Sequence, residues 1–217
     1  MPTLADLKHA LKTQDADNGE TTYNTFVQGF TDYDDSSDSS PIAVDFVADV
    51  SGEPDVNVAA NFVSTAGATV AATFVSTAGA TVAANFVSTA GATVAANFVK
   101  AVTKIDPADS SSTVVSPETA GEFVKSAGTK NSENPAENNA AVFVNAVGAA
   151  EAATFVSAFN KVDPDNSTKT VPAPELAGEI VLGARCGVQQ GWWTSGNLIT
   201  PAAAPAAEEA AAPAAGT

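Results

Sequence analysis

A unit of 12 residues, repeated almost without change, constrains this chain more than any other feature. Residues 61–72 read NFVSTAGATVAA, residues 73–84 read TFVSTAGATVAA, residues 85–96 read NFVSTAGATVAA, and a fourth copy begins at Asn97. A unit this short cannot bury its apolar face alone, so each copy must pack against its neighbours. The sequence therefore predicts a repeat protein in which stacked copies share one core.

A longer repeat continues beyond the 12-residue units. Residues 95–127 align without gaps on residues 152–184, at an offset of 57, and 18 of the 33 aligned positions are identical. In the first of these copies Ser116 is typical of a helix N-cap and Pro117 of the first helical position, and Gly128 stands where a helix ends. These residues predict a helix that begins after Ser116.

The same frame, applied to the 12-residue unit, predicts one short helix over Thr69–Ala78. Its apolar residues share one face: Val70, Ala71, Phe74, Val75 and Ala78. The glycines at 67, 79 and 91 then fall at helix C-termini, where glycine accepts a left-handed backbone. Helices of this length are marginal alone and must stack.

The fold class predicted is mainly α, an array of short helices in a solenoid-like repeat architecture with flexible termini. Thr, Val and Phe also favour strands, so a β-solenoid over residues 57–100 is the alternative. A strand would place adjacent Phe74 and Val75 on opposite faces and would lose the alternation of apolar and polar residues, which favours the helical interpretation.

Composition changes divide the chain into five expected segments. The first carries 12 acidic residues and two lysines, within a total net charge of -16, and begins with a short amphipathic helix whose stripe is Leu4, Leu7 and Leu11. The segments are an acidic N-terminal arm or cap (1–55), the uncharged repeat array (56–100), diverged helical modules (101–184), a Gly/Trp segment (185–200) and a disordered Ala/Pro tail (201–217).

The charge and the scarce reactive residues exclude several function classes. A pI near 4.1 argues against binding a nucleic-acid backbone. The single His9 and single Cys186 leave little for acid–base, thiolate-metal or disulfide chemistry, and no catalytic motif is present, so we expect no enzyme, no cofactor and no small-molecule substrate.

No window of the sequence is apolar enough to span a membrane. No cleavable signal peptide is evident, and we expect a cell-surface or extracellular location by another route in preference to the cytoplasm.

Two acidic loops resemble the calcium-binding loop of EF-hand proteins, in which oxygen ligands alternate and a Glu closes the loop. In both loops the Glu falls at the thirteenth position instead of the twelfth, and the glycine expected in the middle is missing. The resemblance implies calcium ligands at Asp163, Asp165, Ser167 and Glu175 in one loop, and at Asp106, Asp109 and Glu118 in the other. The alternative is that Asp, Pro and Ser simply end one helix and cap the next.

The function predicted is a non-enzymatic structural protein whose partner is itself, a homo-oligomer or polymer that forms a filament, fibre or other extended structure. The uncharged array can meet another copy without like-charge repulsion, and a head-to-tail contact does not close on itself. The expected interface residues are Phe62, Val63, Phe74, Val75, Phe86, Val87, Trp192 and Trp193. The alternatives are a calcium-binding helix–loop–helix module and an ice-binding protein that presents Thr65, Thr77 and Thr89 on a flat surface.

Overall fold

The computed structural model of the chain describes residues 1–50, 56–128 and 138–189. The chain divides into two units, residues 1–182 and residues 183–217. The second unit is described only for residues 183–189, which are the C-terminal part of a helix. The predicted segment boundaries stay predictions, and Trp192, Trp193 and the Ala/Pro tail lie outside the described residues.

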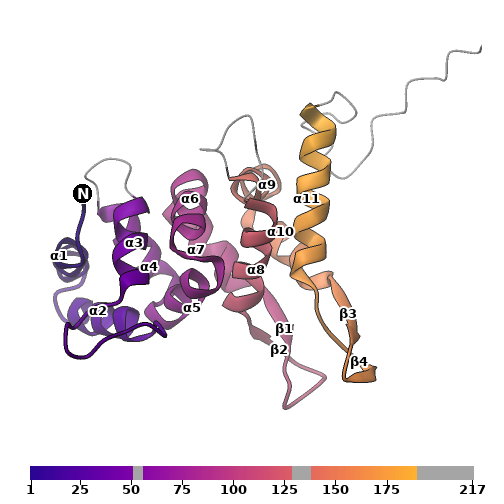
Figure 1. Cartoon of the computed structure of the whole chain (residues 1–217), viewed down its shortest axis with the longest axis horizontal. Coiled ribbons are helices and arrows are strands. Elements are labelled where there is room, and N and C mark those ends of the chain that lie inside the picture. The colour runs from indigo at the N-terminus through magenta and orange to yellow at the C-terminus, as the bar shows by residue number, and fades with distance from the viewer. Residues whose placement is uncertain (51–55, 129–137, 190–217) are drawn as a thin grey trace, which may run out of the picture. The chain divides into compact units, whose positions relative to one another are not determined.

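The described residues are mainly helical, as the sequence predicts, with 11 helices and two small antiparallel sheets (Figure 1). The helices are α1 (Leu4–Gln14), α2 (Gly19–Gln28), α3 (Pro41–Val50), α4 (Asn57–Ala66), α5 (Ala68–Ala78), α6 (Ala80–Ala90), α7 (Ala92–Ala101), α8 (Pro117–Gly128), α9 (Asn139–Val147), α10 (Ala149–Ala158) and α11 (Pro174–Gln189). The strands are β1 (Thr103–Ile105), β2 (Thr113–Val115), β3 (Asn160–Asp163) and β4 (Asn166–Pro172).

The 12-residue units are helices, so the β-solenoid alternative for residues 57–100 does not describe this segment. One glycine joins each helix to the next. Gly67, Gly79 and Gly91 each end one helix and begin another, with φ between 84° and 89° and ψ between 138° and 144°. Residues with a side chain rarely adopt this backbone, which explains why every unit carries a glycine at this position.

Side-chain caps begin three of the helices that do not follow a linking glycine, α3, α8 and α9. The Thr119 N–H donates to Ser116 Oγ (3.3 Å), the Ala43 N–H to Ser40 Oγ (3.2 Å) and the Ala141 N–H to the Asn138 side chain (3.0 Å). All three capping side chains are buried. The cap predicted at Ser116 is therefore confirmed, and it satisfies a backbone donor that has no partner within the helix.

Successive helices turn sharply, and each packs on the helix three places further along the chain. The bend is 112° between α4 and α5 and 114° between α6 and α7 and between α9 and α10. We call the resulting sets columns: column 1 is α1, α4, α7 and α10, column 2 is α2, α5 and α8, and column 3 is α3, α6 and α9. Three 12-residue units therefore complete one turn, and neighbouring units in the sequence lie in different columns.

Hydrogen bonds between turns follow the columns. In column 1 the Gln14 amide donates to Asn61 Oδ1 (2.9 Å), and Lys100 Nζ donates to the Thr65 carbonyl (3.2 Å). In column 3 the Thr81 hydroxyl donates to Asp49 Oδ2 (2.8 Å), and the Asn145 amide to the Thr89 carbonyl (3.2 Å). Polar residues of the units thus bind the adjacent turn of the same molecule.

One continuous line of aromatic rings forms the core of the residues 1–182 unit. Consecutive ring centroids lie 4.9 to 6.1 Å apart. We call this line the Phe ladder; it contains all 11 phenylalanines: Phe26, Phe30, Phe46, Phe62, Phe74, Phe86, Phe98, Phe123, Phe143, Phe155 and Phe159. Tilted and edge-to-face ring pairs at these distances stabilise beyond the burial of their area.

Small residues allow the close approach of helices in column 2. A Cβ atom on Gly121 of α8 would lie 2.8 Å from Thr77 Cβ of α5, and one on Gly29 would lie 2.7 Å from Ala72 Cβ. The equivalent position in α11, Gly178, would meet Ser126 Cβ at 2.5 Å, so the start of α11 continues column 2 over α8. No single described helix is both long and apolar enough to cross a membrane.

Candidate binding groove

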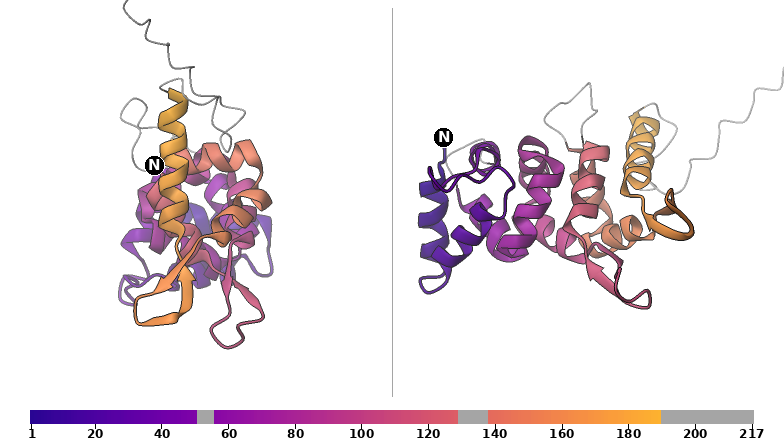
Figure 2. Two further views of the ribbon diagram at one scale, coloured as in Figure 1. Left: turned by 90° about the vertical axis from the view of Figure 1, so that its right-hand side faces the viewer. Right: turned by 60° about the horizontal axis from the view of Figure 1, so that its bottom comes forward.

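The two β-hairpins occupy equivalent places in the 57-residue repeat. Val102 follows α7 and Phe159 follows α10 as C-cap residues with extended backbone, and each leads directly into a strand. In the first hairpin Lys104 pairs with Val114 across the strands, and in the second Lys161 pairs with Val171. Both hairpins project from the same side of the residues 1–182 unit (Figures 1 and 2).

Aspartates close the hairpin turns. The Ala108 N–H donates to Asp106 Oδ1 (2.8 Å), and the Asp165 N–H donates to Asp163 Oδ1 (2.9 Å). Hydrogen bonds from the Ser111 hydroxyl and N–H hold the pKa of the Asp109 carboxyl below its ordinary value. These carboxylates are therefore occupied in forming the turns.

A lysine on the first strand of each hairpin binds a glutamate in the first turn of the following helix. Lys104 Nζ lies 3.6 Å from Glu118 Oε2, and Lys161 Nζ lies 2.5 Å from Glu175 Oε1. The hydrogen bond to Lys161 lowers the pKa of Glu175, and the same bond raises the pKa of Lys161. Each pair fixes its hairpin to the adjoining helix.

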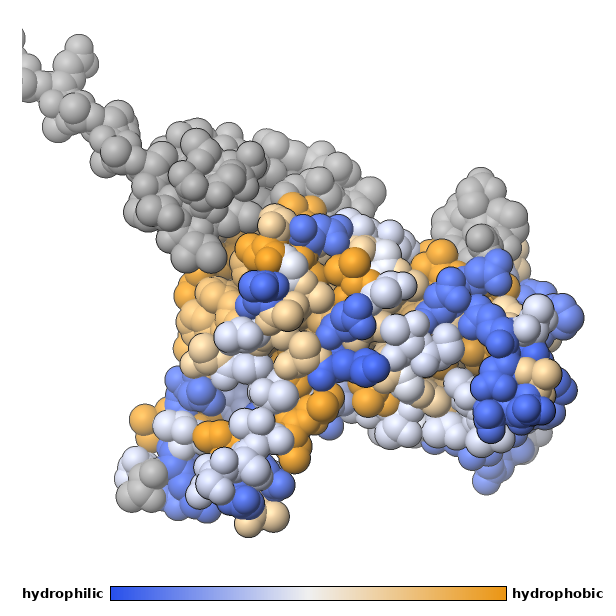
Figure 3. Space-filling view, turned by 180° about the vertical axis from the view of Figure 1, so that it is seen from behind, coloured by the Kyte–Doolittle hydropathy of each residue, from blue (hydrophilic) through white to orange (hydrophobic). Residues whose placement is uncertain are grey.

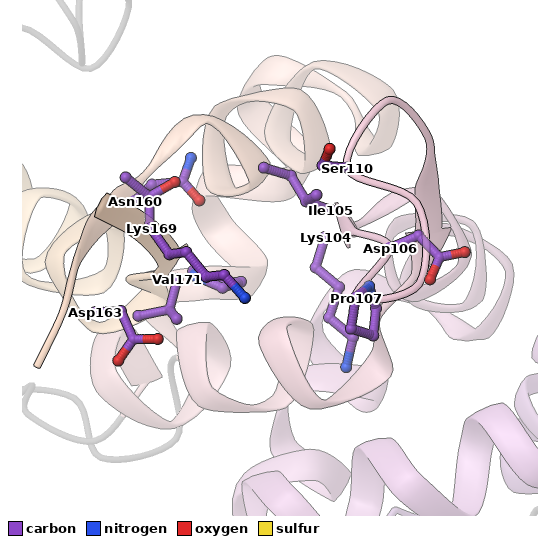
Figure 4. Close-up of a pocket in the computed structure, with 11 residues that line it drawn as sticks. Lys104, Ile105, Asp106, Pro107, Ser110, Asn160, Asp163, Lys169 and Val171 are labelled. Carbon is purple, nitrogen blue, oxygen red and sulfur yellow. The ribbon is translucent and has the colours of Figure 1, made fainter. Parts of the chain in front are cut away.

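A groove of about 550 Å³ lies between the hairpins (Figure 4). The first hairpin contributes β1 and its turn, and the second contributes mainly β4. The lining residues are Lys104, Ile105, Asp106, Pro107, Ser110, Asn160, Asp163, Lys169, Thr170, Val171 and Pro172. Apolar side chains and two amines therefore share one concave surface, as binding sites in proteins commonly combine them.

The Lys169 amine faces the groove more directly than the carboxylates do (Figure 4). The Lys169 amine points into the space between the hairpins, whereas the carboxylates of Asp106 and Asp163 point away from its centre (Figure 4). Lys169 is exposed, and within the described residues the structure gives its amine no ion pair. The groove therefore offers positive charge to an incoming group, although the chain as a whole is acidic.

The residues predicted to bind calcium do not assemble into a metal site. Within the described ranges, no three Asp, Glu, His or Cys side chains lie together as a metal site requires. The two segments that resemble EF-hand loops form the β1–β2 and β3–β4 hairpins. Asp106 and Asp163 close the hairpin turns, and Asp109 accepts hydrogen bonds within a turn. Asp165 and Ser167 lie on the second hairpin. Glu118 and Glu175 bind lysines.

The residues predicted to form a self-assembly interface lie in the core. Phe62, Val63, Phe74, Val75, Phe86 and Val87 are each 0% exposed, so no second molecule can reach them. This part of the prediction is wrong because each unit buries its Phe-Val pair inside its own molecule. Trp192 and Trp193 lie outside the described residues.

The threonines predicted to form a flat surface are divided among the columns. Thr65 lies in α4, Thr77 in α5 and Thr89 in α6, which belong to columns 1, 2 and 3. All three are half-buried, and Thr77 packs against α8 where Gly121 approaches it. The sharp bends between consecutive helices therefore prevent a flat threonine array.

Sequence reasoning did not identify the groove. Lys104 and Lys161 share the pattern Lys-Ile/Val-Asp-Pro at the offset of the long repeat, and this pattern marks the two hairpins. Lys169 has no such signal, because the offset places Ser112 at the equivalent position. No protein-family model, curated protein or solved structure matches the chain.

Proposed function

We propose that this chain is a non-enzymatic structural repeat protein, a helical solenoid that self-assembles into an extended structure. The observation that carries the proposal is the Phe ladder, which runs from Phe26 to Phe159 through all three columns without a break. A core of this kind grows only along one direction, since each turn contacts its neighbouring turns. Such a fold gives a stiff molecule whose length depends on the number of turns.

An uneven charge distribution supports assembly between unlike ends. Residues 1–55 carry 12 of the 25 acidic residues and two of the nine lysines and arginines. Hydrophilic residues gather over the N-terminal helices, and apolar surface is more extensive over the C-terminal helices (Figure 3). Contact between opposite ends of two copies is therefore less repulsive than contact between two of the acidic N-terminal ends.

Exposed apolar side chains accompany the hairpins. Ile105 is 45% exposed, Val115 is 45% exposed and Val162 is 59% exposed. Exposed apolar groups of this size on neighbouring projections favour association with another surface. The interface of the proposed assembly therefore lies at the hairpins instead of at the buried Phe-Val pairs.

Sedimentation velocity across a concentration series tests the proposal. We expect the full-length protein to form species of increasing size as its concentration rises from micromolar to millimolar, because a head-to-tail contact adds copies without limit. A single monomeric boundary across that range, in low and in high salt, would contradict self-assembly.

A further inference from the structure

We propose that the groove between the hairpins of one molecule binds the acidic connection between α2 and α3 of a second copy, residues 29–40. The inference rests on the proposed function and identifies its interface. The groove supplies the Lys169 amine, and the connection supplies the carboxylate of Asp35.

The groove combines an amine that can bind a carboxylate with apolar lining residues. Lys169 points into it without an ion pair among the described residues, while Asp106 and Asp163 are held in their own turns. Ile105 and Val171 line the groove beside the amines. The exposed carboxylate of Asp35 complements the positive charge of Lys169 in this groove.

The α2–α3 connection is organised before binding. The backbones of Asp34 and Ser39 form an isolated bridge, and Asp34 Oδ1 accepts from the Ser36 N–H at 2.9 Å. The Tyr33 hydroxyl donates to Asp38 Oδ1 at 2.8 Å, and the Ile42 N–H donates to Asp32 Oδ2 at 2.8 Å. A loop with these internal bonds loses little conformational entropy on binding.

These internal bonds leave Asp35 to interact with a partner. Asp32, Asp34 and Asp38 each accept a hydrogen bond inside the connection or cap α3, whereas Asp35 is exposed and none of the described hydrogen bonds engages its carboxylate. Asp35 is the group that we place beside Lys169.

The two surfaces lie where a head-to-tail contact needs them. The connection belongs to the first turn of the columns and the hairpins to the last, so the two surfaces lie towards opposite ends of the residues 1–182 unit (Figure 1). The contact is heterologous, so each bound copy offers a free groove to the next. Opposed charges there offset the repulsion that the net charge of -16 imposes between copies.

Complementary charge reversals in the full-length chain test this contact. We expect Lys169→Glu and Asp35→Lys each to raise the concentration needed for assembly by about tenfold or more, since each places like charges together. An equimolar mixture of the two variants should assemble again, because each wild-type surface finds its wild-type partner and the reversed loop meets the reversed groove. Asp17→Lys and Thr93→Glu are the controls, as both change charge at exposed positions away from the contact.

The outcomes separate the contact from the proposed function. If wild type assembles and both variants assemble equally well alone, the proposed interface is wrong while self-assembly stands. If each control changes assembly in the same direction and by a similar amount as the variant whose charge change has the same sign, net charge and not this contact governs assembly, which also overturns the inference. If wild type does not assemble at all, both proposals fail. Circular dichroism of each variant verifies that the helices are retained.

Discussion

At the scale of single residues, identical positions in the 12-residue units have different neighbours. Ser64 donates to the Gln14 side chain, and Ser88 donates to the Val50 carbonyl. Ser76 Oγ is buried and has no hydrogen-bond partner among the residues that the structure describes. The repeated glycines, in contrast, have the same role in every unit. A Cβ atom on Gly67, Gly79 or Gly91 would meet no atom of the described part of the chain within 4 Å, so the backbone conformation is what requires glycine there.

Replacement of Gly79 by alanine measures this backbone requirement. With φ at 86° and open space around it, Gly79→Ala should lower the free energy of unfolding by about 1–2 kcal/mol. Urea denaturation provides the measurement. Gly183→Ala is the matched control, because Gly183 lies inside α11 with open space and no positive φ, and there alanine should stabilise by up to about 1 kcal/mol. Equal effects at both sites would contradict this explanation.

At the scale of the helices, the Phe ladder contributes most of the large buried side chains. Phe86 is 0% exposed, and its ring centroid lies 5.8 Å from that of Phe74 and 5.6 Å from that of Phe98. Phe86 thus connects helices of three different columns. Removing one ring leaves a cavity between these helices, and the helices cannot move far enough to fill it.

We expect Phe86→Ala to lower the free energy of unfolding by about 3–5 kcal/mol, because it removes both ring contacts and leaves a cavity. Thr93→Ala, an exposed change in the neighbouring helix, should stay within about 0.5 kcal/mol. Thermal and urea unfolding of the three proteins test this. A loss for Phe86→Ala no larger than that for Thr93→Ala would show that the ladder does not stabilise the fold.

The pairing of α1 with α2 should depend on pH. Lys8 and Lys12 bind Glu20 at 2.8 and 3.0 Å and lower the pKa of Glu20 from 4.5 to about 2. Because the folded-state pKa is the lower one, the stabilisation is complete above pH 4.5 and is lost as the pH falls towards 2. Glu20→Gln should melt below wild type at pH 7 and together with it near pH 2. A difference in melting temperature that does not change with pH would contradict the ion-pair explanation.

Helix boundaries could be predicted from the sequence because caps and glycine ends are local signals. The helix expected over Thr69–Ala78 matches α5 within one residue, and Leu7 and Leu11 are buried as their stripe predicts. The columns could not be predicted, because they depend on the bend at each glycine. The groove escaped prediction for a related reason: its walls lie 57 residues apart in sequence, and the glutamates that resembled calcium ligands instead bind Lys104 and Lys161.

At the scale of the whole molecule, stability depends on contacts between neighbouring turns. The N-terminal helices α1, α2 and α3 pack on α4, α5 and α6, and α8, α9 and α10 pack on α5, α6 and α7. The middle helices differ from one another at only a few positions. The molecule should therefore accept a change in the number of complete units better than a change in unit length.

Insertion of one more copy of residues 73–84 after Ala84 tests this modularity. Every helix of the insertion variant still finds a nearly identical helix three places away, so we expect a melting temperature within a few degrees of wild type. Insertion of residues 79–84 alone should destabilise the protein strongly, because half a unit displaces Phe and Gly from their positions. Equal melting temperatures for the two insertion variants would contradict packing by columns.

Electron microscopy of the purified full-length protein tests the central claim most directly. Assembly through the groove predicts thin unbranched filaments for wild type, single particles for Lys169→Glu and for Asp35→Lys, and filaments again when these two variants are mixed. Dispersed single particles of wild type at every protein and salt concentration would contradict the claim that this chain builds an extended structure.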